Sequence, residues 1–378
     1  MNNEIGRCLK LKRRHLRRNH QDKYQDRKAG TAFEWNSGMG YSMWILLLVL
    51  SFARFAWATG DLVRLYEWSP GNTLAPIILP VKSGETPEQA ATRYMRELQR
   101  QPELMELFEG RTPDLALSGF KPLNENSRES RALLIANLPK DYGMNSQRVI
   151  NFKKIFAQSR HSSFILPMNA NLGLSLEETR DLFKQISEKF PFMVAMGGDD
   201  VEPTLYKKQN THSRNTIPTR DQFEIQLIKS YVAQEKGFLL GVCRGSQISA
   251  VALGYQLMQD VPFHVGDKVS HGNDWHEIQV HKTKHNILGS LVPNADGKLL
   301  VNSLHHQAVI YKENGPLQLA AQGHDGVTEA TEFKNGRGLL LQFHPELMNN
   351  QLGSKILWRI VQQKNVVMPS RCSKIFAL

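Results

Sequence analysis

Residues Phe238–Leu253 read FLLGVCRGSQISAVAL, and this stretch decides the fold that the rest of the chain must build. Its apolar start is typical of a buried strand, and the apolar residues spaced after Ser246 are typical of a helix. Cys243 lies at the turn between them, flanked by Gly241 and Gly245. Glycines at these positions allow a sharp, strained bend and close packing of helix against strand. The helix that follows directs its free N–H groups at the sulfur, which favours a reactive thiolate.

A histidine and a carboxylate appear further along the chain, where residues 342–346 read QFHPE. His344 is a candidate base, and Glu346 is a candidate for the acid that orients its imidazole. Taken alone, His344 and Glu346 would suit a surface turn, and a lone Gly-x-Cys-x-Gly would suit a structural turn. Together they supply a nucleophile, a base and an orienting acid, which favours a catalytic role.

A repeating pattern of strands and helices surrounds this stretch. Strands are expected at 132–136, 163–167, 192–196, 237–242 and 338–343, and helices at 146–158, 176–189 and 220–236. Such alternation predicts an α/β fold with a mostly parallel sheet covered by helices on both faces, and a site beyond the carboxyl ends of the strands. After Tyr255 the chain alternates polar and apolar residues, which predicts an antiparallel excursion.

Several motifs resemble the class I glutamine amidotransferase-like hydrolases, and the similarity is closer to the γ-glutamyl-γ-aminobutyrate hydrolase branch, a cysteine peptidase family. Besides residues 241–254 and 342–346, the motifs are GGDDVEP at 197–203, RDQFE at 220–224 and NSLHHQAV at 302–309. The resemblance covers residues 131–365 and says nothing about the first 130. It implies a flavodoxin-like sheet, a γ-glutamyl amide substrate, and no cofactor or metal.

The resemblance also implies site residues beyond Cys243, His344 and Glu346. The backbone N–H groups of Gly198 and Arg244 are expected to form an oxyanion hole. Asp199 stands where the family often carries a third glycine. The sequence therefore leaves open which backbone N–H of this turn points into the site. Six residues are expected to line the substrate pocket: Gly197, Arg220, Glu224, Gln247, His306 and Gln307. For the segment 220–224 the alternative is that its acidic side chains only favour a helix N-terminus.

Four histidines invite a metal interpretation: His271, His276, His281 and His285. Their spacing does not match a compact zinc site. Residues 276–281 instead alternate in the manner of a strand, so we expect no metal there.

The first 58 residues differ from the rest of the chain. They hold eleven Lys and Arg against four Asp and Glu, and so carry most of the net charge of +11. Residues 44–53 form an apolar run, which is short for a membrane span of about 20 residues. The run and the following Ala56-Trp57-Ala58 predict a signal peptide and a mature start at Thr59, with a signal-anchor as the alternative. Either arrangement places the catalytic domain outside the cytosol, in the periplasm or secreted.

Four segments follow from these patterns. They are the basic leader with its signal peptide or signal-anchor (1–58), a small helical accessory segment with a linker (59–130), the hydrolase domain (131–365) and a C-terminal tail (366–378). Within the accessory segment, Thr86 and Pro87 are expected to begin a helix, and Pro102 to break it.

The sequence predicts a cysteine hydrolase whose partner is a small-molecule or peptide γ-glutamyl substrate. The alternatives are a glutamine amidotransferase subunit that supplies ammonia to a synthase, and a non-enzymatic binding protein that retains the fold. No recognition motif accompanies the basic leader, so no nucleic-acid partner is expected. Membrane contact is expected only through residues 44–58 if they are uncleaved, and a homodimer stays open. Three cysteines are too few for a disulfide framework.

Overall fold

The computed structural model describes residues 61–70, 74–101, 118–123, 130–136, 144–291, 296–348 and 351–363. These residues belong to a compact unit that spans Gly60–Leu378. The leader, the signal-peptide pattern, Pro102 and the C-terminal tail lie outside the described residues. Within those ranges, no helix is both long enough and apolar enough to cross a membrane.

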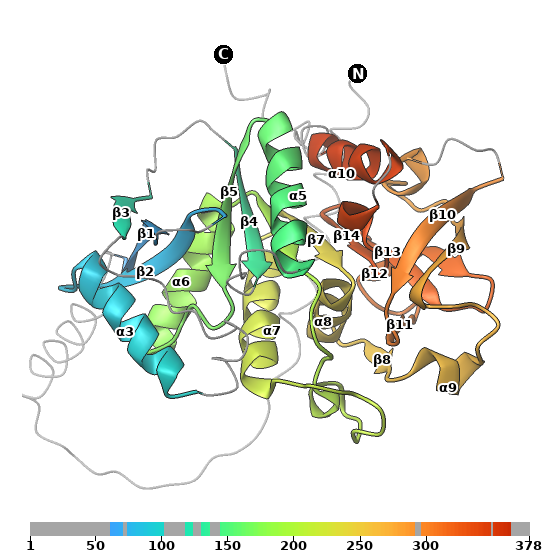
Figure 1. The fold of residues 1–378 in the computed structure, drawn as a ribbon, viewed down its shortest axis with the longest axis horizontal. Helices are drawn as coiled ribbons and strands as arrows, with labels where there is room; N and C mark the ends of the chain where they lie inside the picture. Colours follow the sequence, from blue (N-terminus) through green and yellow to red (C-terminus); the bar gives the residue numbers. More distant parts are fainter. Residues whose placement is uncertain are drawn as a thin grey trace, which may run out of the picture. The chain divides into compact units, whose positions relative to one another are not determined.

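A mostly parallel sheet forms the centre of this unit (Figure 1). Its six parallel strands lie in the order β2 (Ile77–Lys82), β5 (His161–Pro167), β4 (Ser130–Ala136), β6 (Phe192–Ala195), β7 (Phe238–Val242) and β14 (Gly338–Leu341). The predicted strands of the hydrolase domain are all present, each within a few residues of its expected bounds. Their carboxyl ends share one edge, where a site is expected.

Antiparallel strands extend the sheet beyond β14. They lie in the order β13 (Thr328–Phe333), β12 (Leu317–Gly323), β9 (Gly272–Val280) and β10 (Lys298–Leu304). A separate pair, β8 (Gln256–Met258) and β11 (Ala308–Ile310), is also antiparallel, and the short helix α9 (Val261–Val265) follows β8. This is the antiparallel excursion expected after Tyr255.

The opposite edge of the sheet comes from the segment before residue 131. Strands β1 (Val63–Ser69) and β3 (Gly119–Pro122) pair antiparallel with each other, and β1 pairs with β2. Helix α3 (Pro87–Gln99) was expected in this segment, but the three strands were not. The described part of the accessory segment is therefore continuous with the main sheet.

Helices cover both faces of the sheet (Figure 1). Helices α3, α5 (Met144–Gln158) and α10 (Gln351–Gln363) share one hydrophobic cluster with the strands. Helices α6 (Leu176–Lys189), α7 (Pro218–Ala233) and α8 (Arg244–Ala252) share the other. Along β4, Leu134 belongs to the first cluster and Leu133 and Ile135 to the second, as the two-residue period of a strand requires. The predicted α/β fold is confirmed.

Local signals begin two of these helices where the sequence predicts. Ser175 caps α6, because its Oγ accepts from Glu178 N while the Glu178 carboxylate accepts from Ser175 N. Thr86 and Gln89 form the same reciprocal box at the start of α3. Each box satisfies backbone donors that a helix start otherwise leaves without partners.

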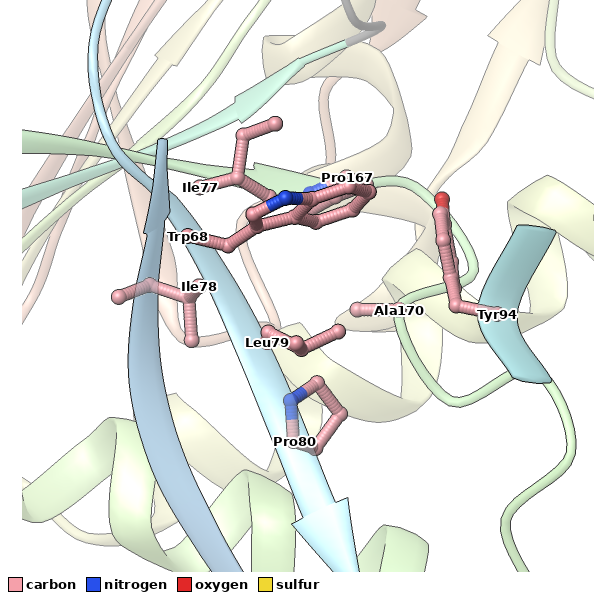
Figure 2. A pocket seen from close by; sticks show the side chains of 8 residues that line it. All are labelled: Trp68, Ile77, Ile78, Leu79, Pro80, Tyr94, Pro167 and Ala170. Atoms are coloured by element: carbon pink, nitrogen blue, oxygen red, sulfur yellow. The ribbon is translucent and has the colours of Figure 1, made fainter. Parts of the chain in front are cut away.

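A small apolar hollow lies between α3 and the sheet (Figure 2). It is lined by Trp68, Ile77, Ile78, Leu79, Pro80, Tyr94, Pro167 and Ala170. Because it leaves no room for a water-sized molecule and offers almost no polar surface, it is a packing feature of this edge and not a binding site.

Candidate active site

Cys243 occupies a strained turn between β7 and α8. Its backbone lies at φ +53° and ψ −115°, which a residue with a side chain rarely adopts. Its N–H donates to Leu341 O at 2.8 Å, so β14 helps to hold the turn. Such a backbone costs on the order of 1–3 kcal/mol and persists only where the surroundings impose it. The structure therefore has the sharp strand-to-helix turn that the sequence predicts at Cys243.

The two glycines beside Cys243 are needed for close packing. A Cβ on Gly245 would come within 1.8 Å of Ala195 O, and one on Gly241 within 2.8 Å of Gly245 O. No side chain fits at either position without moving backbone atoms. The close approach of α8 to β6 and β7 thus depends on both glycines, as expected from the sequence.

His344 and Glu346 form a buried pair after β14. His344 Nδ1 lies 2.7 Å from Glu346 Oε1, and both side chains are almost fully buried. Burial alone would lower the pKa of His344, but the negative charges of Glu346 and Cys243 outweigh it and raise that pKa to about 9. Nε2 makes no well-aligned hydrogen bond within the described residues, yet Cys243 is near enough to affect the ring. Such loose contacts are common before substrate binds.

Polar side chains from other elements fix this pair. Asn302 on β10 accepts from His344 N through Oδ1 and donates to His344 O through Nδ2, each at 3.0 Å. Asn151 on α5 donates to Glu346 O at 2.7 Å, and Arg148 Nε lies 3.9 Å from Glu346 Oε1. None of these three roles was predicted from the sequence. Only Asn302 had a signal, since it begins the motif NSLHHQAV.

A glycine turn after β6 lies against the histidine. A Cβ on Gly197 would be 3.1 Å from His344 Cε1, and one on Gly198 would be 2.8 Å from Arg220 Nη2. Glycines therefore let the main chain pass close to both side chains. The turn lies beside the His344 ring, and an oxyanion donor from Gly198 is expected there. Arg244, the other expected donor, is the first residue of α8.

A buried ion cluster lies beneath this turn and the elbow. Arg244 donates to Glu224 Oε2 at 2.7 Å and also bonds Asp221, while Arg220 donates to Glu224 Oε1 at 2.9 Å. All four side chains are almost fully buried. Burial raises the pKa of Glu224, but the two arginines outweigh it and lower that pKa, so the carboxylate stays charged.

This cluster changes the interpretation of the segment 220–224. Arg220 and Glu224 were expected to line the pocket or to favour a helix N-terminus. The structure instead uses both side chains inside the cluster, where Glu224 has an arginine on each oxygen. Their placement suits a brace under the Cys243 turn and the glycine turn, and pocket lining stays a prediction for both residues.

Gln247 and Gln307 are buried and joined to each other. Gln247 Nε2 donates to Gln307 O at 3.0 Å and to Gln342 Oε1 at 3.3 Å. Gln307 Nε2 donates to Ser213 Oγ at 2.8 Å. Both Nε2 atoms thus already donate hydrogen bonds to other described residues. These bonds connect α8 to the segment after β10.

His306, one of the residues predicted to line the pocket, is partly exposed. Its side chain is 31% exposed, with Nε2 3.0 Å from Asp200 Oδ2 and Nδ1 3.5 Å from Asp260 Oδ2. The Asp200 carboxylate raises the pKa of His306 against the opposing effect of burial. Its exposure is that of a residue that a bound molecule could reach.

Enzymes that combine such an elbow with this α/β fold form the class I glutamine amidotransferases and their hydrolase relatives. Residues 146–346 match the sequence profile of Peptidase C26, and the chain belongs to that family.

Two curated relatives are similar to the chain. The glutamine amidotransferase-like protein YvdE of Lactococcus lactis is 32% identical over 203 residues, which cover 52% of this chain and 79% of that protein. Protein NtpR of Enterococcus hirae is 34% identical over 170 residues, which cover 42% of this chain and 67% of that protein. Among solved structures, a glutamine amidotransferase from Thermotoga maritima covers 64% of this chain and 94% of its own at 18% identity, with a TM-score of 0.39. Family and relatives support an amide-hydrolysing enzyme of the cysteine hydrolase or amidotransferase type.

Proposed function

We propose that the protein hydrolyses a γ-glutamyl amide bond through a thioester on Cys243, with His344 and Glu346 completing a triad. The observation that supports this most strongly is the positive φ of Cys243 beside a buried histidine whose Nδ1 lies 2.7 Å from a carboxylate. Strain of this kind is a feature of functional sites. A structural cysteine would need neither the turn nor the pair.

In the first step the Cys243 thiolate attacks the γ-carbonyl carbon, and the carbonyl oxygen becomes an oxyanion. Backbone N–H groups of Gly198 and Arg244 stabilise that charge. The C–N bond then breaks as protonated His344 gives its proton to the leaving amine. A γ-glutamyl thioester remains on Cys243.

In the second step water attacks the thioester while neutral His344 takes the water proton. The C–S bond breaks, glutamate leaves, and the thiolate is restored beside a protonated histidine. Glu346 keeps the imidazole oriented and stabilises its cation in both steps. The raised pKa of His344 suits the protonated resting state that this cycle needs.

The test is a substrate screen with the full-length chain. The panel holds γ-glutamyl amides of aliphatic amines, amino acids and aminobutyrate, the matched α-glutamyl amides, and free glutamine. Released glutamate and amine are measured for the wild type and for Cys243→Ala. We expect turnover of at least one γ-glutamyl amide, none of its α-isomer, and none by the variant.

Two results would argue for another activity. Hydrolysis of glutamine alone would favour an amidotransferase-type glutaminase. Absence of turnover, with a γ-glutamyl compound bound equally by the wild type and Cys243→Ala, would favour a binding protein.

We further infer that the catalytic unit is exported. The apolar run 44–53 followed by Ala56-Trp57-Ala58 supports this. N-terminal sequencing of the mature protein from its native host should find its first residue at or near Thr59. An intact N-terminus in the membrane fraction would favour the signal-anchor, and a full-length, freely soluble cytosolic protein would contradict both arrangements.

A further inference from the structure

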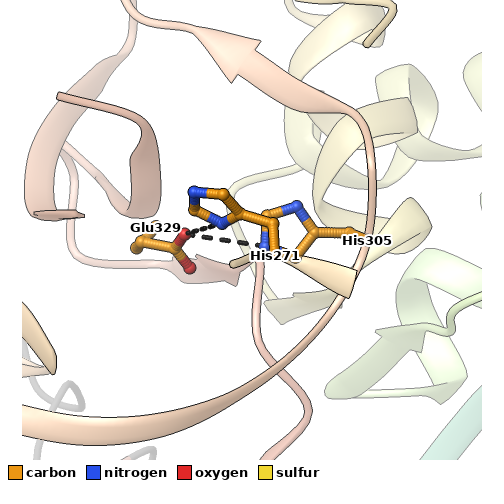
Figure 3. Close-up of side chains that lie close together, drawn as sticks. All are labelled: His271, His305 and Glu329. Carbon is orange, nitrogen blue, oxygen red and sulfur yellow. Dashed lines mark ion pairs between the residues drawn. The ribbon is translucent and has the colours of Figure 1, made fainter. Parts of the chain in front are cut away.

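Histidines and a glutamate from three separate parts of the antiparallel excursion meet inside the protein. His271 precedes β9, His305 follows β10, and Glu329 lies on β13 (Figure 3). One ligand atom from each of the three lies within 4.8 Å of the others. His276 on β9 joins them, with Nε2 at 3.4 Å from Glu329 Oε1. The His271, His305 and Glu329 side chains are at most 1% exposed, and His276 is 9% exposed.

The second nitrogen of each histidine already has a partner. His271 Nε2 lies 2.8 Å from Asp325 Oδ2, His276 Nδ1 lies 3.1 Å from Ser270 O, and His305 Nδ1 lies 3.0 Å from Gln307 O. These acceptors place the proton of a neutral imidazole on the far nitrogen. The near nitrogen then turns a lone pair toward Glu329. An outer acceptor on the far nitrogen is the usual arrangement for a histidine that binds a metal.

The distances inside the cluster are long for hydrogen bonds. Oε1 of Glu329 lies 3.3 Å from His271 Nδ1, 3.4 Å from His276 Nε2 and 3.6 Å from His305 Nε2. Within the described residues, neither Glu329 oxygen makes a well-formed hydrogen bond, although the side chain is fully buried. With zinc–ligand bonds of about 2.0–2.1 Å, neighbouring ligand atoms of a tetrahedral site lie about 3.3 Å apart. These distances to Glu329 Oε1 are compatible with ligand atoms around a common cation.

The burial of the cluster also bears on which charge it holds. Glu329 is fully buried, and a carboxylate there is costly unless positive charge compensates it. A metal ion or protons on the imidazoles can supply that charge, and an experiment can separate the two.

We propose that His271, His305 and Glu329 bind one zinc ion, with His276 nearest to the fourth position. Imidazole nitrogens select a transition metal over calcium or magnesium. Because its ligands are buried side chains of the protein, we assign the site a structural role.

The zinc would stabilise the strands that position His344, the proposed catalytic base. Asn302, which holds the His344 main chain, lies on β10 three residues before His305. Glu329 O accepts from Gln342 N at 2.8 Å, two residues before His344. Fixing His305 and Glu329 therefore fixes both strands that position His344.

The direct test is metal analysis of the full-length chain, purified without a histidine tag, loaded with zinc and dialysed. We expect about one zinc per chain, and a melting temperature that falls when a chelator removes the metal and recovers with zinc. His271→Ala and Glu329→Gln should each lose the metal. His324→Gln is the matched control, because His324 is 58% exposed and outside the cluster. It should retain zinc.

Asp325→Asn keeps the test decisive if the ligand variants fail to fold. This change leaves every ligand in place but weakens the acceptor for His271 Nε2, so zinc affinity should fall by about 10- to 100-fold. A wild type that stays metal-free after loading, with a melting temperature indifferent to zinc, would overturn the proposal in favour of a protonated cluster. Equal zinc in the wild type and Glu329→Gln would overturn it as well.

Discussion

The side-chain amide of Asn302 pairs with the main chain of His344 as one strand pairs with another, accepting from N and donating to O at 3.0 Å each. The main chain of His344 is thereby positioned from β10, a strand far from β14 in the order of the sheet.

Asn302→Ala should lower kcat by about 10- to 100-fold with little change in KM, because a small misplacement of a catalytic group is costly while substrate contacts remain. Unfolding free energy should fall by roughly 1–3 kcal/mol, since two buried main-chain groups lose their partner. Steady-state kinetics and urea unfolding measure the two effects. Asn335→Ala, in an exposed turn, is the control. An unchanged kcat would show that Asn302 does not position His344.

Cys243→Ser should abolish turnover and leave the fold intact. The hydroxyl fits the elbow but lacks thiolate nucleophilicity, so kcat should fall by roughly 10⁴-fold or more. Circular dichroism checks the fold, and Cys372→Ser is the control, since that cysteine lies outside the catalytic motifs. Near-normal activity in Cys243→Ser would remove the basis of the proposed mechanism.

Glu346→Gln should reduce kcat less than His344→Ala does, by a margin of about 10- to 100-fold. The acid orients the imidazole and stabilises its cation, whereas the histidine transfers the proton. Single-turnover kinetics on both variants measure the margin. Negligible effects from both would point to another base, and His306 would be the first candidate.

The alkaline side of the pH profile should report His344. Its pKa is raised to about 9, so the protonated form and the stability it brings are fully present below the ordinary value of 6.5 and are lost as pH rises through about 9. We expect kcat/KM to fall near that pH, and the fall to move to lower pH in Glu346→Gln. Glu235→Gln, on the exposed surface, should leave it in place. A profile that Glu346→Gln does not move would assign the alkaline fall to a different group.

Arg244→Met should lower the free energy of unfolding by about 3–5 kcal/mol, because it leaves the buried carboxylates of Asp221 and Glu224 without a main partner. Urea unfolding measures this loss. Arg100→Met removes an exposed pair with Glu97 and should cost less than about 1 kcal/mol. Equal losses in the two variants would mean that the buried cluster contributes no special stability.

Local signals allowed much of the fold to be predicted from sequence. The Ser175–Glu178 box and the apolar spacing after it located α6, and the glycines around Cys243 located the elbow. Strand β2 was harder to recognise, because it contains Pro80, which is unusual in a central strand. It is tolerated where β2 pairs with β5 only at Ile77.

The proposed catalytic residues could be recognised in the sequence because each lies in a short motif with its own chemistry. The supporting residues could not be, because their roles depend on which strands become neighbours. His271, His305 and Glu329 do not form a motif with a recognisable spacing. They come together only when β9, β10 and β13 take their places in the folded sheet. The same reason hid the Arg244–Glu224 pair, since a charged residue early in a helix has a simpler local explanation.

The hydrogen bond from Cys243 N to Leu341 O also affects the order in which this part of the protein can form during synthesis. Translation proceeds at about 5–20 residues per second, so Cys243 is synthesised seconds before β14, the strand that holds the turn at Cys243. His344 follows that strand directly. In a nascent chain that has not reached β14, the turn at Cys243 therefore lacks this hydrogen bond, and the arrangement proposed for catalysis is complete only when β14 joins the sheet.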